Sequence, residues 1–138
     1  MATKVLLIED EPLLSSLYAA MLHRDAYDVS MAMDATTGEE KVVTVRPHVV
    51  LLDLLIPGKL GADSANENYH EPMGFQILRF VKSTPSLSNT RVIILSNLDS
   101  DEHLKRAHEL GANQYLVKSN LDPHELGKHV EEVLHGSS

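Results

Sequence analysis

Polar side chains that can bind cations or anions stand at the ends of several short apolar runs in this sequence. An acidic group at residues 9–11 ends the first run, and a single aspartate, Asp53, interrupts the run VVLLDLLIPG at residues 49–58. Ser96 ends the later run VIILS, and Lys118 directly follows YLV. Burying an unpaired ionised carboxylate costs several kcal/mol. Asp53 therefore needs a compensating partner from elsewhere in the chain.

The side-chain types in this set suit phosphoryl transfer. Carboxylates such as Glu9, Asp10 and Asp53 repel one another unless a cation lies among them. With oxygen ligands, no cysteine and no paired histidine spacing, Mg²⁺ is favoured over zinc. Lys118 adds a fixed ammonium and Ser96 a hydroxyl that can hydrogen-bond an oxyanion. Catalysis of phosphoryl transfer consists mainly of in-line positioning and charge neutralisation, and an aspartate can form an acyl phosphate. We therefore interpret Asp53 as the nucleophile.

Apolar runs that alternate with helix-like segments indicate how these residues are positioned. The runs at residues 5–8, 49–52, 92–95 and 115–117 predict strands buried on both faces, and residues 27–33 predict a fifth, weaker strand. Five helices are predicted between and after them, at residues 12–24, 36–45, 73–82, 101–110 and 123–134.

Repeated alternation of strand and helix is typical of an α/β domain. We predict a doubly wound, five-stranded parallel sheet flanked by five helices. The carboxyl ends of parallel strands share one edge of a sheet, and ligands bind in the crevice outside that edge. Because the polar residues follow the strands, we expect them to meet there.

Length and composition indicate one soluble domain over residues 1–138, with a frayed tail at about residues 135–138. The net charge is −8, with 12 Lys and Arg against 20 Asp and Glu, so direct binding to nucleic acid is not expected. The chain has no cysteine, no signal-peptide pattern and no apolar stretch of membrane-spanning length. We therefore predict a cytoplasmic protein that does not insert into membranes.

Four motifs stand in the order and approximate spacing of a known family. They are LLIEDEP, VVLLDLLIPG, VIILSN and LGANQYLVKS. Over nearly its whole length the chain resembles the receiver domains of bacterial two-component response regulators, which have a flavodoxin-like, CheY-like fold. The resemblance is to the single-domain type.

The resemblance implies a role for each site residue. Glu9 and Asp10 correspond to the acidic pair that holds Mg²⁺, together with Asp53 and the backbone carbonyl of Leu55. Asp53 corresponds to the phosphoacceptor, and Lys118 to the lysine that binds the phosphate.

The resemblance also implies a switch rather than an enzyme with an external substrate. Ser96 corresponds to the switch hydroxyl and Tyr115 to the switch aromatic. A histidine kinase or a histidine phosphotransfer protein would supply the phosphoryl group, and the domain would catalyse only its own phosphorylation and dephosphorylation. No effector domain follows the last helix, so we expect output through phosphorelay or through an unknown protein that contacts residues 101–110, Tyr115 and residues 123–134.

The sequence departs from the family pattern in three places. Ser119 follows Lys118 where the family commonly has proline in a cis peptide, so this bond is expected to be trans or strained. Asn113 and Gln114 replace acids of a dimer face that the DNA-binding branch shares, and we therefore expect a monomer. An insertion at about residues 59–73 stands beside the site. A long insertion at such a place is usually a lid, a binding loop or a disordered segment.

Two other functions fit parts of the pattern. A hydrolase of the haloacid dehalogenase type also phosphorylates an aspartate, but it needs a second acid two residues later, where this chain has Leu55. A receiver-like binding module that acts without phosphorylation is the other alternative.

Overall fold

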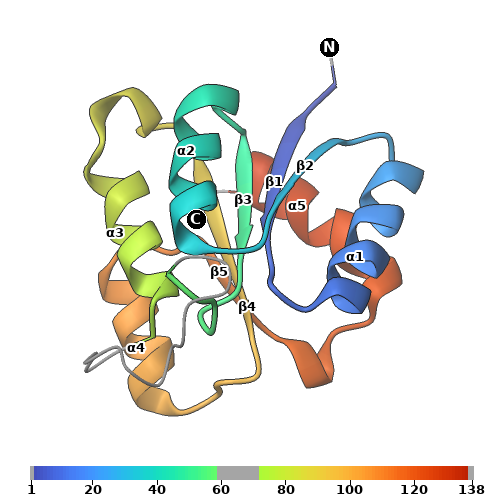
Figure 1. Ribbon diagram of the computed structural model, residues 1–138. Helices are drawn as coiled ribbons and strands as arrows, with labels where there is room; N and C mark the ends of the chain where they lie inside the picture. The colour runs from blue at the N-terminus through green and yellow to red at the C-terminus, as the bar shows by residue number, and fades with distance from the viewer. Residues whose placement is uncertain (1, 59–71, 137–138) are drawn as a thin grey trace.

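Five strands alternate with five α-helices in the computed structural model, which describes residues 2–58 and 72–136 (Figure 1). The strands are β1 (Lys4–Ile8), β2 (Asp28–Ala32), β3 (Val49–Leu52), β4 (Arg91–Ser96) and β5 (Gln114–Val117). The α-helices are α1 (Pro12–Arg24), α2 (Ala35–Val45), α3 (Gly74–Ser83), α4 (Asp101–Glu109) and α5 (Leu126–His135). Short 3-10 turns lie at Pro85–Leu87, Lys118–Asn120 and Pro123–Glu125. The predicted insertion lies outside the described residues, apart from Pro72 and Met73.

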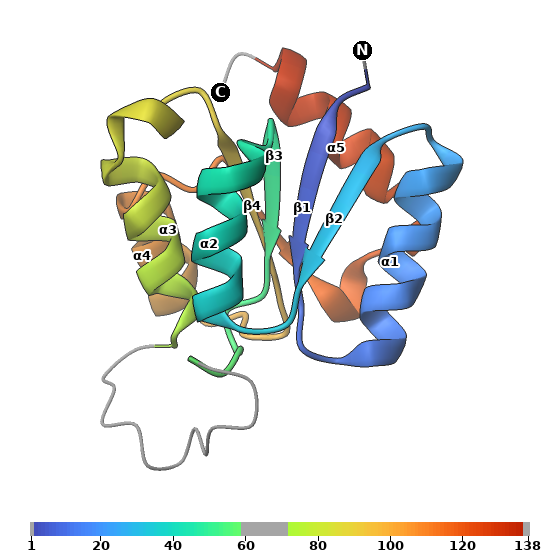
Figure 2. The same ribbon diagram turned by 45° about the horizontal axis from the view of Figure 1, so that its top comes forward.

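The strands form one parallel sheet in the order β2-β1-β3-β4-β5 (Figure 2). Ile8 pairs with Leu52, and Leu52 pairs with Ile94. The carboxyl ends of β1, β3 and β4 are therefore level at one edge of the sheet. This topology confirms the predicted doubly wound α/β fold.

The helices cover both faces of the sheet. Helices α1 and α5 lie on one face, and α2, α3 and α4 lie on the other (Figures 1 and 2). Each face has its own apolar core, since Tyr18 and Leu22 of α1 cluster with Val130 of α5, whereas Val42 of α2 clusters with Phe75 of α3. Burial of both strand faces explains why β1, β3 and β4 read as continuous apolar runs.

Two local predictions need correction. Strand β5 was expected to be buried on both faces, but all four of its residues are only half-buried because it forms an edge of the sheet. The last helix was expected at residues 123–134, but a 3-10 turn at Pro123–Glu125 precedes α5, which extends to His135. His135 therefore belongs to the helix rather than to the predicted tail, and residues 137–138 lie outside the described part of the chain.

Gly74 allows α3 to begin very close to the loop after β3. A Cβ atom at Gly74 would lie 2.6 Å from the Asp53 carbonyl oxygen and 2.6 Å from the Leu54 Cα atom. The Gly74 N–H also donates to the Leu54 carbonyl at 2.9 Å. Only glycine fits this contact without a backbone shift, so Gly74 helps to position the segment that carries Asp53.

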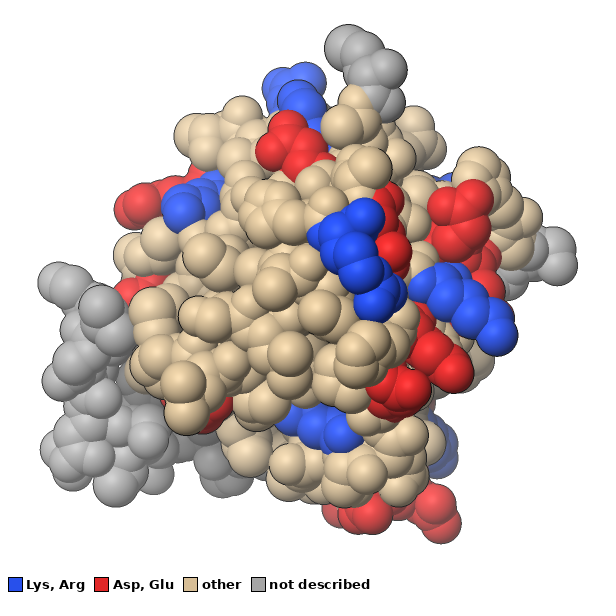
Figure 3. All heavy atoms as spheres, turned by 90° about the vertical axis from the view of Figure 1, so that its right-hand side faces the viewer, with Lys and Arg blue, Asp and Glu red and all other residues tan. Residues whose placement is uncertain are grey.

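Helix α1 presents an outer face without charge along most of its length. Leu13 is 80% exposed and Leu17 is 40% exposed, and Ser16 and Ala20 between and beyond them are also exposed. The view onto this side of the molecule shows a broad area without Lys, Arg, Asp or Glu (Figure 3). No helix among the described residues is long and apolar enough to span a membrane.

Candidate functional site

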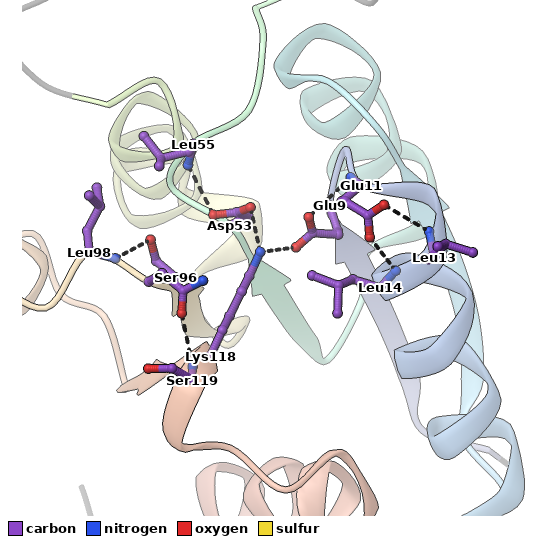
Figure 4. Close-up of polar contacts among 11 residues, drawn as sticks. Glu9, Glu11, Leu13, Leu14, Asp53, Leu55, Ser96, Leu98, Lys118 and Ser119 are labelled. Atoms are coloured by element: carbon purple, nitrogen blue, oxygen red, sulfur yellow. Dashed lines mark hydrogen bonds and ion pairs between the residues drawn. The ribbon is translucent and has the colours of Figure 1, made fainter.

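The predicted site residues meet at the carboxyl edge of the sheet (Figure 4). Glu9 directly follows β1, Asp53 follows β3, Ser96 is the last residue of β4 and Lys118 follows β5. Glu9, Asp53 and Ser96 are 1%, 5% and 0% exposed. The Asp53 N–H donates to the Ile8 carbonyl at 3.0 Å, so pairing between the strands places Asp53 beside Glu9.

Lys118 is the partner that Asp53 was expected to need. Its Nζ atom donates to Asp53 Oδ2 at 2.8 Å and to Glu9 Oε2 at 2.6 Å, and its side chain is 10% exposed. Burial alone would lower the pKa of the Lys118 ammonium, but the hydrogen bonds to Asp53 and Glu9 outweigh it and raise that pKa. The lysine therefore stays charged and offsets part of the cost of burying two carboxylates.

Three carboxylates form one group at this edge. Oxygen atoms of Glu9, Asp10 and Asp53 all lie within 4.8 Å of one another. Burial is the main cause that raises the pKa of Glu9 and of Asp10, and the nearby charge of Asp53 raises both further. Lys118 neutralises only one of the three charges, so the ionised group favours a further cation. Hard oxygen ligands in this arrangement fit Mg²⁺.

The loop after β3 binds the second carboxylate oxygen of Asp53. The Leu55 N–H donates to Asp53 Oδ1 at 3.1 Å, while Lys118 holds Oδ2. These two hydrogen bonds therefore fix the orientation of the Asp53 carboxylate. The Leu55 side chain is 53% exposed and points away from the acids (Figure 4). Its backbone carbonyl as a metal ligand stays a prediction.

Ser96 and Tyr115 are joined through Leu98. The Ser96 hydroxyl accepts a hydrogen bond from the Leu98 N–H at 3.2 Å, and the Tyr115 hydroxyl donates to the Leu98 carbonyl. Burial raises the pKa of the Tyr115 phenol. The two predicted switch residues therefore already contact the same peptide segment after β4.

Other residues near the edge have structural roles. Glu11 caps α1, since its carboxylate accepts from Leu13 N and Leu14 N at 3.4 and 2.7 Å. It is separate from the group formed by Glu9, Asp10 and Asp53. The Lys118–Ser119 peptide is trans, because no cis peptide bond occurs among the described residues.

Asn97 was not identified from the sequence. Its Oδ1 atom accepts a hydrogen bond from the Ser119 N–H at 2.9 Å, so it contacts the segment that carries Lys118. A signal was present, because serine in place of proline supplies a backbone N–H that can donate to an acceptor. The acceptor itself lies 22 residues away along the chain, and local patterns do not reveal such a pair.

Comparison with known proteins gives one consistent family. The model of the response regulator receiver domain matches residues 5–131. A gliding motility regulatory protein of Myxococcus xanthus is 32% identical over 133 residues, which cover 94% of this chain and 15% of that protein. The transcriptional regulator RpaA of Synechocystis is 25% identical, over 95% of this chain and 48% of that protein. The chain thus spans less than half the length of these curated relatives.

Solved structures show the same fold. The BeF3-activated N-terminal receiver domain of RstA from Klebsiella pneumoniae has a TM-score of 0.78 at 26% identity, and the match covers 96% of this chain and 99% of that one. The chemotaxis response regulator CheY4 of Vibrio cholerae has a TM-score of 0.77 at 23% identity, covering 97% and 100% of the two chains.

Proposed function

This chain belongs to the response regulator receiver domain family, and from that premise we propose that it is a signalling switch that accepts a phosphoryl group on Asp53. The observation that carries the proposal is the buried Asp53 carboxylate, 2.8 Å from the Lys118 ammonium and grouped with Glu9 and Asp10. A buried nucleophile between a fixed cation and a set of metal ligands suits phosphoryl transfer.

In the proposed reaction, a carboxylate oxygen of Asp53 attacks the phosphorus of a phosphohistidine. A new O–P bond forms, the N–P bond breaks, and the imidazole nitrogen leaves with the electron pair. Mg²⁺ bound by Glu9, Asp10, Asp53 and the Leu55 carbonyl would supply positive charge to the transferred oxygens. Lys118 supplies a second positive charge by moving its hydrogen bond from the carboxylate to the phosphate.

The response to phosphorylation would run through the segment after β4. A phosphoryl group on Asp53 offers the Ser96 hydroxyl a new acceptor, and rotation of the side chain toward it would break the bond that the Ser96 oxygen now accepts from the Leu98 N–H. Tyr115 is bonded to the carbonyl of the same Leu98, so a shift of this residue reaches β5. Phosphorylation would thereby bias the surface formed by α4, β5 and α5.

The phosphoryl donor is proposed to be a histidine kinase or a histidine phosphotransfer protein that docks over α1. The uncharged outer face of this helix, with Leu13 and Leu17 exposed, begins two residues after the acidic cap Glu11 and lies close to the site. Burial of such a face favours association without ionic contacts. We further propose that the domain is a cytoplasmic monomer without direct nucleic-acid binding, and that output passes to another protein or onward by phosphorelay.

One experiment separates this function from the two alternatives. The protein is incubated with Mg²⁺ and acetyl phosphate, and its intact mass is followed with time, beside an Asp53→Asn variant and a sample with chelator. We expect one phosphoryl group on the wild type and none in either control. Continuous turnover of a separately added, external phosphoester would indicate a hydrolase, although the apolar Leu55 offers no acid for a leaving group. No reaction would indicate a binding module that acts without phosphorylation.

A further inference from the structure

A hydrogen bond from Ser119 to Asn97 links two halves of the candidate site. The Ser119 N–H donates to Asn97 Oδ1 at 2.9 Å. Asn97 directly follows Ser96, which carries the buried hydroxyl of the site. Ser119 directly follows Lys118, which carries the ammonium of the site. The bond therefore joins the main chain beside the lysine to the segment after β4.

The donor exists because residue 119 is serine. Proline at this position would have no N–H, and the Asn97 oxygen would lose its partner. Both residues are exposed at the surface, so the bond is not needed to satisfy a buried group. Its effect is to hold two loops together rather than to stabilise the core.

This bond extends the contact between the two segments past Lys118, because the pairing of β4 with β5 ends at Ser96 and Val117. The bond from Tyr115 to Leu98 joins β5 to the same loop, but three residues before Lys118. Lys118 has a long, flexible side chain, and its ammonium must lie within hydrogen-bond distance of Asp53 Oδ2. An anchor on the adjacent peptide restricts where that side chain begins.

We propose that Asn97 is a positioning residue for phosphoryl transfer, which holds the Lys118–Ser119 peptide so that the ammonium stays over Asp53. The inference rests on the proposed function, because the ammonium serves as a phosphate ligand only if Asp53 is phosphorylated. Asn97 also joins the lysine loop to Ser96, so the two groups that would contact the phosphate are held in one relative position.

The acceptor side is tested with three variants and one probe. Asn97→Leu keeps the size of the side chain but removes the acceptor, and Asn97→Asp keeps an acceptor oxygen. Asn120→Leu changes an exposed asparagine of the same loop as a matched control. Binding of beryllium fluoride, a phosphoryl mimic, is measured with Mg²⁺ at high ionic strength, so that the charge added by aspartate is screened.

We expect Asn97→Leu to weaken beryllium fluoride binding by about threefold to tenfold, the range for one lost hydrogen bond. Asn97→Asp should restore most of the affinity, and Asn120→Leu should change little. The Mg²⁺ affinity and the unfolding midpoint of Asn97→Leu should stay close to the wild type. If Asn97→Leu instead caused a general loss of structure, the beryllium fluoride affinity, the Mg²⁺ affinity and the unfolding midpoint would all fall together. That result would contradict a positioning role.

The donor side gives a second, independent test. Ser119→Pro removes the N–H, so Asn97→Leu should have no additional effect on beryllium fluoride binding in the Ser119→Pro background. An equal further loss in that background would overturn the inference, as would unchanged binding by Asn97→Leu alone. A wild-type protein that binds no beryllium fluoride would instead overturn the proposed function, and this inference with it.

Discussion

At the scale of single residues, the central feature is one lysine shared by two buried carboxylates. Lys118 lies 2.6 Å from Glu9 and 2.8 Å from Asp53, and Asp10 adds a third acid to the same group. Removing one partner of a buried ion pair leaves the other charge uncompensated. The stability of the fold and the charge balance of the site are therefore coupled through Lys118.

Lys118→Ala is expected to lower the free energy of unfolding by about 3 kcal/mol when no divalent cation is present. Mg²⁺ should restore more stability to this variant than it adds to the wild type, because a cation can replace the lost ammonium as the partner of the acids. Urea unfolding with and without Mg²⁺ measures both effects. Lys105→Ala, an exposed lysine of α4, is the control. An equal loss of stability with and without Mg²⁺ would contradict this coupling.

Two leucines lie at positions that can influence the lifetime of an acyl phosphate. Leu55 stands two residues after Asp53, and Leu98 stands two residues after Ser96. Apolar side chains can neither orient an attacking water nor accept its proton, so the phosphorylated form is expected to be long-lived. Leu98 packs partly against the core, whereas Leu55 is mainly exposed, which makes Leu55 the cleaner position to change.

Leu55→Asn should speed the loss of phosphate on the order of tenfold, because an amide can orient a water toward the phosphorus. The decay of phosphorylated protein is followed by intact mass after removal of acetyl phosphate. Leu104→Asn, at another exposed leucine, should decay like the wild type. Wild-type decay within seconds, or an unchanged rate in Leu55→Asn, would show that this neighbour does not control the lifetime.

At the scale of elements, apolar runs and helix caps were sufficient to predict the order of strands and helices. The run at residues 49–52 is β3 without change, because a strand buried on both faces has a strong local signal. The half-buried state of β5 was missed, since its place at the sheet edge follows from strand order and not from local pattern. Asn97 was missed for a related reason, because its partner Ser119 comes from a different loop.

Helix α1 carries a prediction about the partner. Phosphotransfer profiling first identifies a histidine kinase that phosphorylates the wild type. Leu13→Glu and Leu17→Glu should each reduce the rate of phosphotransfer from this kinase by about tenfold or more, because a charge would have to be buried on docking. Phosphorylation by acetyl phosphate, which needs no docking surface, should be unchanged. Val43→Glu places the same charge on an exposed apolar position of α2 and should affect neither donor. Equal losses with both donors would contradict docking over α1.

At the scale of the whole molecule, one sheet packs between two apolar cores. The site lies at the carboxyl ends of β1 and β3, where the order of the strands reverses direction. Helices α1 and α3, which follow the neighbouring strands β1 and β3, pack on opposite faces of the sheet, and ligands bind at the carboxyl ends of strands arranged in this way. The bonds through Leu98 connect the segment after β4 to β5 at the sheet edge. We propose that a phosphoryl group on Asp53 reaches the outer surface by this route.

Phosphorylation should therefore change amide chemical shifts beyond the site itself. We expect changes at residues 101–110 and at Tyr115 as well as around Asp53, and Tyr115→Ala should reduce those in α4. Two-dimensional NMR of the protein with and without phosphorylation measures them. Changes confined to the neighbourhood of Asp53 would contradict a switch that reaches this surface.

The central claim is that Asp53 is the phosphoacceptor, and chemical trapping of the phosphorylated residue tests it most directly. Borohydride reduces an acyl phosphate to the alcohol, so phosphorylated aspartate becomes homoserine, which peptide mass spectrometry can locate. After incubation with Mg²⁺ and acetyl phosphate, we predict homoserine at position 53, with no homoserine at Asp10 and no 2-amino-5-hydroxypentanoic acid, the alcohol of a reduced glutamate, at Glu9. A reduced acid at another position, or full phosphorylation of Asp53→Asn, would contradict the account.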